Sequence, residues 1–117
     1  MSKVLVIDDE KMMVSLVRQV LSEADFKVDT ALAGDDGLRK FTGGDYDLVI
    51  TDIRLPGTDG HQVVNFIRAS ERGKTPVIGI SGTPWLLKDS AFDRVLAKPF
   101  SIKSLIDTAQ SLVTASN

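Results

Sequence analysis

Residues 4–10 read Val-Leu-Val-Ile-Asp-Asp-Glu, an uninterrupted apolar run that ends in a group of acidic residues. A short continuous run rich in β-branched residues is typical of a strand that is buried on both faces of a parallel sheet. The run is too short for the hydrophobic region of a signal peptide, and it continues directly into the acids. Residues 4–10 therefore predict a buried strand followed by a cluster of carboxylates.

The same pattern recurs along the chain. Residues 48–52 read Leu-Val-Ile-Thr-Asp and residues 76–80 read Pro-Val-Ile-Gly-Ile, while weaker strand patterns occupy residues 27–32 and 94–97. Stretches with helical spacing of apolar residues lie between them. The first two helices are expected over residues 11–24 and over residues 35–41, before Gly43-Gly44. A third is opened by His61 and has Val63, Val64 and Ile67 on its apolar face. A short helix over residues 84–90, capped by Thr83, and a last one from Ile102 to Val113, capped by Ser101, complete the set.

Strand and helix alternate along the whole chain, with short connections. Such alternation predicts an α/β fold with a doubly wound parallel sheet, because each right-handed crossover must pack back on the sheet. Ligands of these folds bind outside the carboxyl ends of the strands, near the switch in strand order. The residues that directly follow the strands are therefore the candidates for function.

Composition narrows the class of protein. The chain has 117 residues, enough for one compact domain over residues 1–117, and its net charge of −2 does not favour nucleic acid or an anionic membrane. There is no cysteine, and no apolar run approaches the length that spans a bilayer. We expect a cytoplasmic domain, and Met1 with a short polar C-terminal tail favours a free-standing protein.

Five polar side chains follow the predicted strands. Asp8 and Asp9 follow the first, Asp52 the third, Ser81 the fourth and Lys98 the fifth. Clustered carboxylates repel one another unless a cation neutralises them, and hard oxygen ligands suit Mg²⁺. A carboxylate beside Mg²⁺ can attack a phosphoryl group, while a lysine and a hydroxyl stabilise the phosphoryl oxygens. The pattern favours Asp52 as the acceptor of the phosphoryl group, with Lys98 and Ser81 stabilising the phosphoryl oxygens.

Simpler interpretations exist for these residues. Asp8, Asp9 and Glu10 would also suit the acidic first turn of the following helix, although Asp52 at another strand end makes this less favoured. Glu10 fits the helix start slightly better than a metal site. His61 is the only histidine, and a solvated position suits it better than phosphotransfer or metal binding. The peptide bond between Lys98 and Pro99 can be cis or trans.

Four blocks of sequence together resemble the signature of bacterial two-component response-regulator receiver domains, of the single-domain, chemotaxis-regulator-like type. The resemblance covers essentially the whole chain, and each block lies at a predicted strand end. The blocks are residues 6–10 (Val-Ile-Asp-Asp-Glu), 51–60 (Thr-Asp-Ile-Arg-Leu-Pro-Gly-Thr-Asp-Gly), 80–82 (Ile-Ser-Gly) and 96–100 (Leu-Ala-Lys-Pro-Phe).

The resemblance implies a five-stranded, flavodoxin-like (βα)5 fold with strand order 2-1-3-4-5. It also implies that Mg²⁺, or Mn²⁺ in its place, is held by Asp8, Asp9, Asp52 and the backbone carbonyl of Arg54. Asp52 would accept a phosphoryl group from a sensor histidine kinase or a phosphotransfer protein, with Ser81 and Lys98 binding that group. Such a protein is no enzyme beyond its own phosphorylation and dephosphorylation, and it would act by binding a downstream protein.

The sequence departs from this family in the region that would transmit the signal. Many receivers carry an aromatic residue three positions before the lysine, where this chain has Val95, which has no ring to rotate. The segment from Ser81 to Lys98 is shorter than usual by roughly four to six residues, about one helical turn. We expect Leu87 and Phe92 to join the core, and the position of Trp85 stays open.

Two other functions compete with a phosphorylated switch. A haloacid-dehalogenase-like phosphohydrolase also forms an aspartyl phosphate, but it requires an Asp-x-Asp motif, and residues 8–10 read Asp-Asp-Glu. A degenerate receiver could serve as a constitutive interaction module, which Val95 and the shortened segment suggest. Arg54 and Thr83 occupy places that influence the lifetime of the phosphoryl group in the family.

Overall fold

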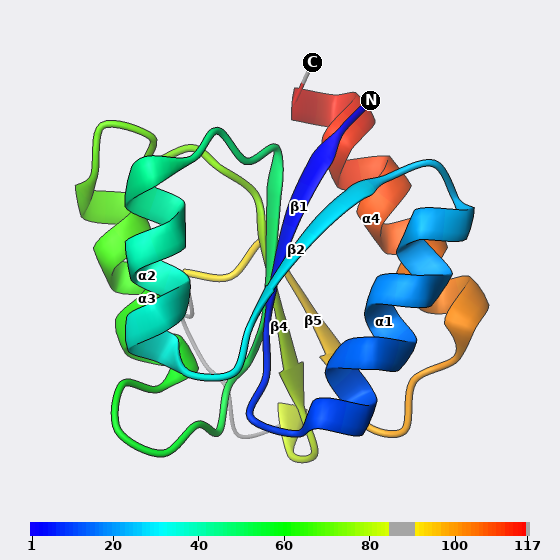
Figure 1. Cartoon of the computed structure of the whole chain (residues 1–117), viewed down its shortest axis with the longest axis horizontal. Coiled ribbons are helices and arrows are strands. Elements are labelled where there is room, and N and C mark those ends of the chain that lie inside the picture. The colour runs from blue at the N-terminus through cyan, green and yellow to red at the C-terminus, as the bar shows by residue number, and fades with distance from the viewer. Residues whose placement is uncertain (85–90, 117) are drawn as a thin grey trace.

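A computed structural model of the chain describes residues 1–84 and 91–116 (Figure 1). From β1 to β4, and again from β5 to α4, strands and helices alternate as the sequence predicts. The elements are β1 (Lys3–Ile7), α1 (Lys11–Glu23), β2 (Lys27–Ala31), α2 (Gly34–Gly43), β3 (Leu48–Asp52), α3 (Gly60–Ala69), β4 (Val77–Ser81), β5 (Arg94–Ala97) and α4 (Ile102–Ser116).

The strands form one parallel sheet in the order β2-β1-β3-β4-β5. This is the flavodoxin-like order that the resemblance implied, and the doubly wound fold is confirmed. The order reverses at β1, whose neighbours are β2 and β3. The carboxyl ends of β1 and β3 are therefore adjacent at the point where this fold binds its ligands.

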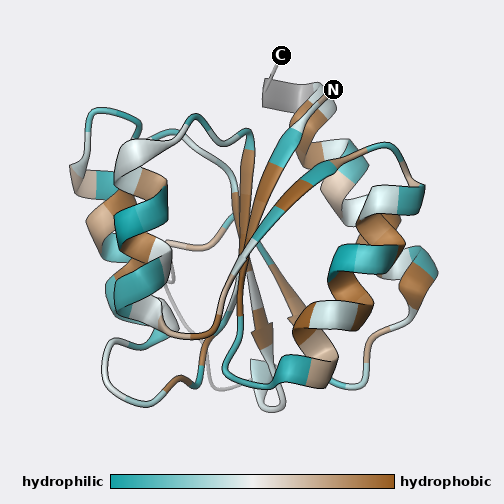
Figure 2. Cartoon of the chain, in the orientation of Figure 1, coloured by the Kyte–Doolittle hydropathy of each residue, from teal (hydrophilic) through white to brown (hydrophobic). Residues whose placement is uncertain are grey.

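Helices cover both faces of the sheet (Figure 1). The helices α1 and α4 pack on one face, whereas α2 and α3 pack on the other. Neighbouring residues of β1 and β3 alternate between these two cores, so that both strands are buried on both sides. Hydrophobic colouring of these strands in Figure 2 follows from this double burial.

Local chemistry sets where the elements begin. The backbone N–H of Ser104 donates to the Ser101 hydroxyl at 3.0 Å, which confirms Ser101 as the cap of the last helix. The predicted strand at residues 76–80 instead runs from Val77 to Ser81. Proline has no N–H for a ladder, and Pro76 contributes only its carbonyl, which accepts from Val49 N at 3.0 Å.

The end of the sheet opposite the carboxyl ends is held by a half-buried arginine of α3. The Arg68 guanidinium donates to the carbonyls of Ala91, Gly73 and Thr75 at 2.6–3.2 Å, and to the Asp93 carboxylate at 2.6 Å. Arg68 thus joins α3 to the segment that leads into β5. Nothing in the sequence pattern of α3 had marked this residue.

Of the predictions on the shortened segment, only one falls on described residues. Phe92 is buried, with 9% of its surface exposed, and this confirms that it belongs to the core. Residues 85–90 of the expected helix, with Trp85 and Leu87, lie outside the described part of the chain. Among the described residues, no helix has the length and apolar character needed to cross a bilayer.

Candidate functional site

The predicted carboxylates converge at the carboxyl ends of β1 and β3. Ile7 and Thr51 are partners in the sheet register, so Asp8 and Asp52, which follow them, lie side by side. One oxygen from each of Asp8, Asp9 and Asp52 lies within 4.8 Å of the others. Asp8 and Asp52 are buried, whereas Asp9 is exposed. The structure therefore brings together the three side chains that the sequence predicted as metal ligands.

Asp8 is the most constrained of these carboxylates. Its Oδ1 accepts the backbone N–H of Glu10 at 3.0 Å, while its buried Oδ2 has no hydrogen-bond partner. Burial, together with the negative charges of Asp52 and Asp9, raises the pKa of Asp8 to about 6 against the opposing effects of the Glu10 N–H and Lys98. A buried, unpartnered carboxylate oxygen facing two other carboxylates is the donor set expected for a hard divalent cation.

The acidic residues are not a solvated first turn of α1. This helix begins at Lys11 and has no acidic residue in its first turn, and Asp8 is only 2% exposed. Glu10 is the N-cap residue, and its exposed side chain makes no capping hydrogen bond. The placement of Glu10 at the helix start agrees with the interpretation that the sequence slightly favoured.

Asp52 is paired with the predicted lysine. The Lys98 ammonium lies 2.9 Å from Asp52 Oδ2, and Asp52 Oδ1 accepts the backbone N–H of Arg54 at 3.2 Å. Burial alone would lower the pKa of Lys98, but the hydrogen bond to Asp52 and the surrounding negative charges raise it above its ordinary value. Lys98 therefore stays positively charged beside the carboxylate cluster. The Lys98–Pro99 peptide bond is cis.

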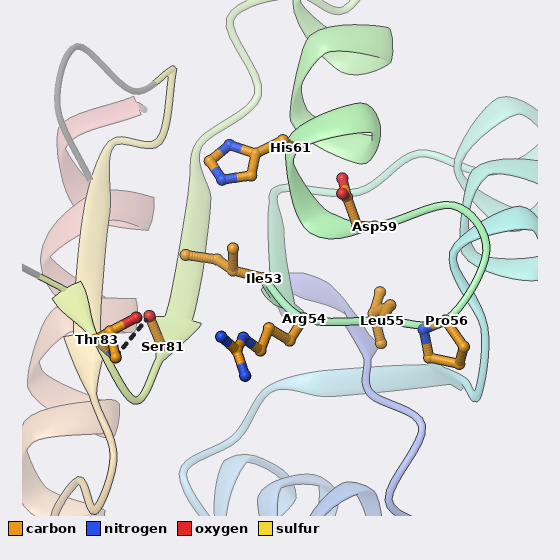
Figure 3. Close-up of a pocket in the computed structure, with 8 residues that line it drawn as sticks. All are labelled: Ile53, Arg54, Leu55, Pro56, Asp59, His61, Ser81 and Thr83. Atoms are coloured by element: carbon orange, nitrogen blue, oxygen red, sulfur yellow. Dashed lines mark hydrogen bonds between the residues drawn. The ribbon is translucent and has the colours of Figure 1, made fainter. Parts of the chain in front are cut away.

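Ser81 lies at the same edge, at the end of β4. Its side chain is buried, and its Oγ accepts the backbone N–H of Thr83 at 3.0 Å (Figure 3). The Ser81 carbonyl accepts the backbone N–H of Lys98 at 2.9 Å, which fixes the ends of β4 and β5 to each other. Ser81 is thus placed next to the charged cluster, although its hydroxyl bonds to its own loop.

A pocket of about 590 Å³ opens beside this cluster (Figure 3). Its walls come from the loop after β3, the start of α3 and the end of β4. The lining residues are Ile53, Arg54, Leu55, Pro56, Asp59, His61, Ser81 and Thr83. Figure 3 shows the guanidinium of Arg54 reaching across this space toward Ser81. The role of the Arg54 carbonyl as a metal ligand stays a prediction.

A capping box fixes the loop that carries Arg54. The Asp59 carboxylate accepts the Gln62 backbone N–H at 3.0 Å, and the Gln62 side chain accepts the Asp59 N–H at 2.9 Å. In the sequence, Asp59 was noted only as part of the signature block of residues 51–60. The signal was present, since an aspartate followed three residues later by glutamine marks a helix start.

The sequence profile of the response regulator receiver domain matches residues 4–110. The chain belongs to this family. The transcriptional regulatory protein HprR of Escherichia coli K12 is 38% identical over 114 residues, which covers 89% of this chain and 48% of HprR. ResD of Bacillus subtilis 168 is 31% identical over 117 residues, which covers 96% of this chain and 48% of ResD. The chain spans about half the length of these relatives.

Solved receiver structures have the same fold. A receiver domain protein from Clostridium thermocellum superimposes with a TM-score of 0.91 at 25% identity, covering 99% of this chain and 97% of that one. The response regulator TrrA of Thermotoga maritima, in complex with Mg²⁺-BeF, gives a TM-score of 0.87 at 33% identity, covering 96% and 99%. The family is that of two-component response regulators, as the signature blocks suggested.

Proposed function

We propose that this receiver domain is a phosphorylated switch, in which Asp52 takes a phosphoryl group from a histidine kinase or a phosphotransfer protein in a Mg²⁺-dependent step. The observation that carries the proposal is the pairing of Asp52 with Lys98 at 2.9 Å beside the unpartnered Oδ2 of Asp8. One nucleophilic carboxylate, one fixed ammonium group and one cluster of oxygen ligands for a cation are the parts that phosphoryl transfer to a carboxylate requires.

Each residue of the site has its own part in the phosphoryl transfer. An oxygen of the Asp52 carboxylate forms the new O–P bond as the P–N bond of the donor phosphohistidine breaks, and the imidazole leaves. The Lys98 ammonium group neutralises charge on the phosphoryl oxygens. The Ser81 hydroxyl can donate a hydrogen bond to the phosphoryl group while it still accepts from Thr83. The proposal makes the protein a substrate of its kinase and no enzyme toward other molecules.

Asp8, Asp9 and Asp52 would hold Mg²⁺, or Mn²⁺ in its place. When bound, the cation supplies positive charge that stabilises the phosphoryl oxygens during transfer. The structure of TrrA in complex with Mg²⁺-BeF supports this assignment by family membership. The phosphorylated domain would then act by binding a downstream protein, in the cytoplasm as the sequence predicts.

A small phosphodonor tests the proposal without the kinase. Incubation with acetyl phosphate and Mg²⁺ is expected to add the mass of one phosphoryl group to the wild type and nothing to Asp52→Asn. Asp45→Asn is the matched control, because Asp45 precedes the opposite end of β3 and its side chain is 91% exposed. It should be modified as the wild type is. An unmodified wild type, tested also with candidate kinases, would favour the constitutive interaction module instead.

A further inference from the structure

Two aromatic rings lie beside the phosphorylation site and have no role in the transfer itself. His61 is the second residue of α3, and Phe92 lies just before β5. Their ring centroids are 5.8 Å apart with an interplanar angle of 61°, an edge-to-face arrangement. Phe92 is buried, whereas His61 is exposed and lines the 590 Å³ pocket. The pair therefore connects the core to the surface.

The buried ring of Phe92 belongs to the same core cluster as Ile53, the residue that follows the phosphoacceptor. A Cβ atom placed on Gly79 would lie 2.9 Å from Ile53 Cδ1 and 3.0 Å from Phe92 Cδ1, so both side chains fill the space above Gly79. The Ile53 N–H donates to the Ile80 carbonyl at 3.0 Å, which holds Ile53 against β4. A continuous packed path thus runs from Asp52 through Ile53 and Phe92 to His61.

The far end of this path has room to change. The pocket is lined by Ile53 and His61 as well as by Ser81 and Thr83 from the end of β4 (Figure 3). A phosphoryl group on Asp52 is much larger than the carboxylate, and Asp52 is only 6% exposed. Tightly packed side chains transmit such a change in volume to their neighbours, and the open pocket gives the rings space to move.

We infer that phosphorylation of Asp52 moves the Phe92–His61 pair, which reports the state of the site at the surface of the pocket. The inference rests on the proposed phosphorylation of Asp52. Phe92, which lies just before β5, would take the role that an aromatic residue at position 95 has in many receivers. Val95 has no ring for that role. The half-buried Val95 side chain packs against the same core as Phe92 but offers no polar or aromatic group to the surface.

Nuclear magnetic resonance can follow this pair directly. His61 is the only histidine of the chain, so its two imidazole C–H signals are unique in a carbon-correlated spectrum. Beryllium fluoride with Mg²⁺ serves as a lasting stand-in for the phosphoryl group, and acetyl phosphate modification is quantified in parallel by mass. We expect the His61 signals to shift by more than a line width, and the cross-peaks between the His61 and Phe92 rings to change in intensity.

Variants separate a relay through Phe92 from a direct effect of charge on His61. Phe92→Leu is expected to remove more than half of the shift of the His61 signals. Phe66→Leu changes a 46% exposed ring on α3, the helix that also carries His61, and should leave the shift intact. The ring cross-peaks of the wild type give the same answer should Phe92→Leu fail to fold.

The outcomes distinguish the two proposals. An adduct on Asp52 with unchanged His61 signals, or with a shift that Phe92→Leu retains in full, overturns the relay and leaves the phosphoacceptor function standing. If no adduct forms with acetyl phosphate or a kinase, the phosphoacceptor function fails and the relay that rests on it fails too.

Discussion

Asp8 destabilises the metal-free protein at neutral pH. Its pKa of about 6 in the fold exceeds its ordinary value of 3.8, so the folded chain holds this proton more tightly than the unfolded chain does. The difference corresponds to a free energy on the order of 3 kcal/mol once both states have lost the proton. The cost fits a residue that is kept for binding a cation.

Asp8→Asn is therefore expected to raise the stability of the metal-free protein. The amide keeps the oxygen that accepts from Glu10 and can donate to the neighbouring carboxylates. Urea denaturation with a chelator at pH 7.5 should give an increase of about 1–3 kcal/mol in the free energy of unfolding. Mg²⁺ should stabilise the wild type and have little effect on the variant. A less stable variant without metal would contradict the strain assigned to Asp8.

Asp8 makes the stability of the metal-free protein depend on pH. Between about pH 4 and pH 6 the folded chain retains the Asp8 proton that the unfolded chain has lost, so Asp8 lowers stability as pH rises through this window. The stability difference between Asp8→Asn and wild type should grow across the window and stay constant above it. Mg²⁺ affinity of the wild type should fall below pH 6, where protons compete for Asp8. Titration calorimetry between pH 5 and pH 8 measures this affinity.

For single residues, the sequence predicted which side chains meet at the site but not which hydrogen bonds each of them makes. Asp8, Asp52 and Lys98 could be brought together from their places after the strands, because parallel strands end at one edge. The free Oδ2 of Asp8 and the bond from Thr83 to Ser81 depend on loop geometry that no pattern encodes. The contact of His61 with Phe92 joins residues far apart in the sequence, and so it was missed.

Among the elements, α3 is hydrogen-bonded through Arg68 to the segment that leads into β5. Arg68→Met removes the donor of three carbonyls and the cation beside the Asp93 carboxylate, which keeps only the Val77 N–H, and we expect a loss on the order of 3 kcal/mol in urea denaturation. Arg39→Met is the control, since Arg39 pairs with Asp36 at 3.4 Å and its side chain is 76% exposed. Its effect should stay within about 0.5 kcal/mol. Equal losses in the two variants would refute this role of Arg68.

The middle of β4 requires a glycine for a different reason. Gly79→Ala would push against Ile53 and Phe92, and overpacking of this kind costs about 1–3 kcal/mol. Gly82→Ala, just beyond the same strand, meets no atom within 4 Å and should be close to neutral. Denaturation midpoints of the two variants decide the matter. A neutral Gly79→Ala would show that Phe92 does not pack there.

Element types were more predictable from sequence than element ends. Buried strands were recognised from their apolar runs, since both faces of the sheet are covered. The helix predicted at residues 35–41 extends from Gly34 to Gly43, because glycine in a terminal turn does not stop the hydrogen-bonding pattern. Gly34 also packs tightly, as a Cβ atom there would lie 2.1 Å from the Thr58 carbonyl oxygen.

On the scale of the whole molecule, alternation and the signature blocks were enough to predict the doubly wound sheet and its family. The chain-wide pattern is reliable because the βα unit recurs along the chain. What the pattern leaves open is communication across the fold. The path from Asp52 to His61 passes through Phe92, and the Arg68 connection ends at Ala91 and Asp93, so both reach the residues just before β5.

The most direct measurement locates the phosphoryl group. The protein is incubated with acetyl phosphate, with Mg²⁺ or with a chelator, reduced with borohydride, which converts an aspartyl phosphate to homoserine, and digested for peptide mass analysis. We expect homoserine at position 52 in the Mg²⁺ sample and none with the chelator. Modification at another carboxylate, or equal modification of Asp52 without a divalent cation, would contradict it.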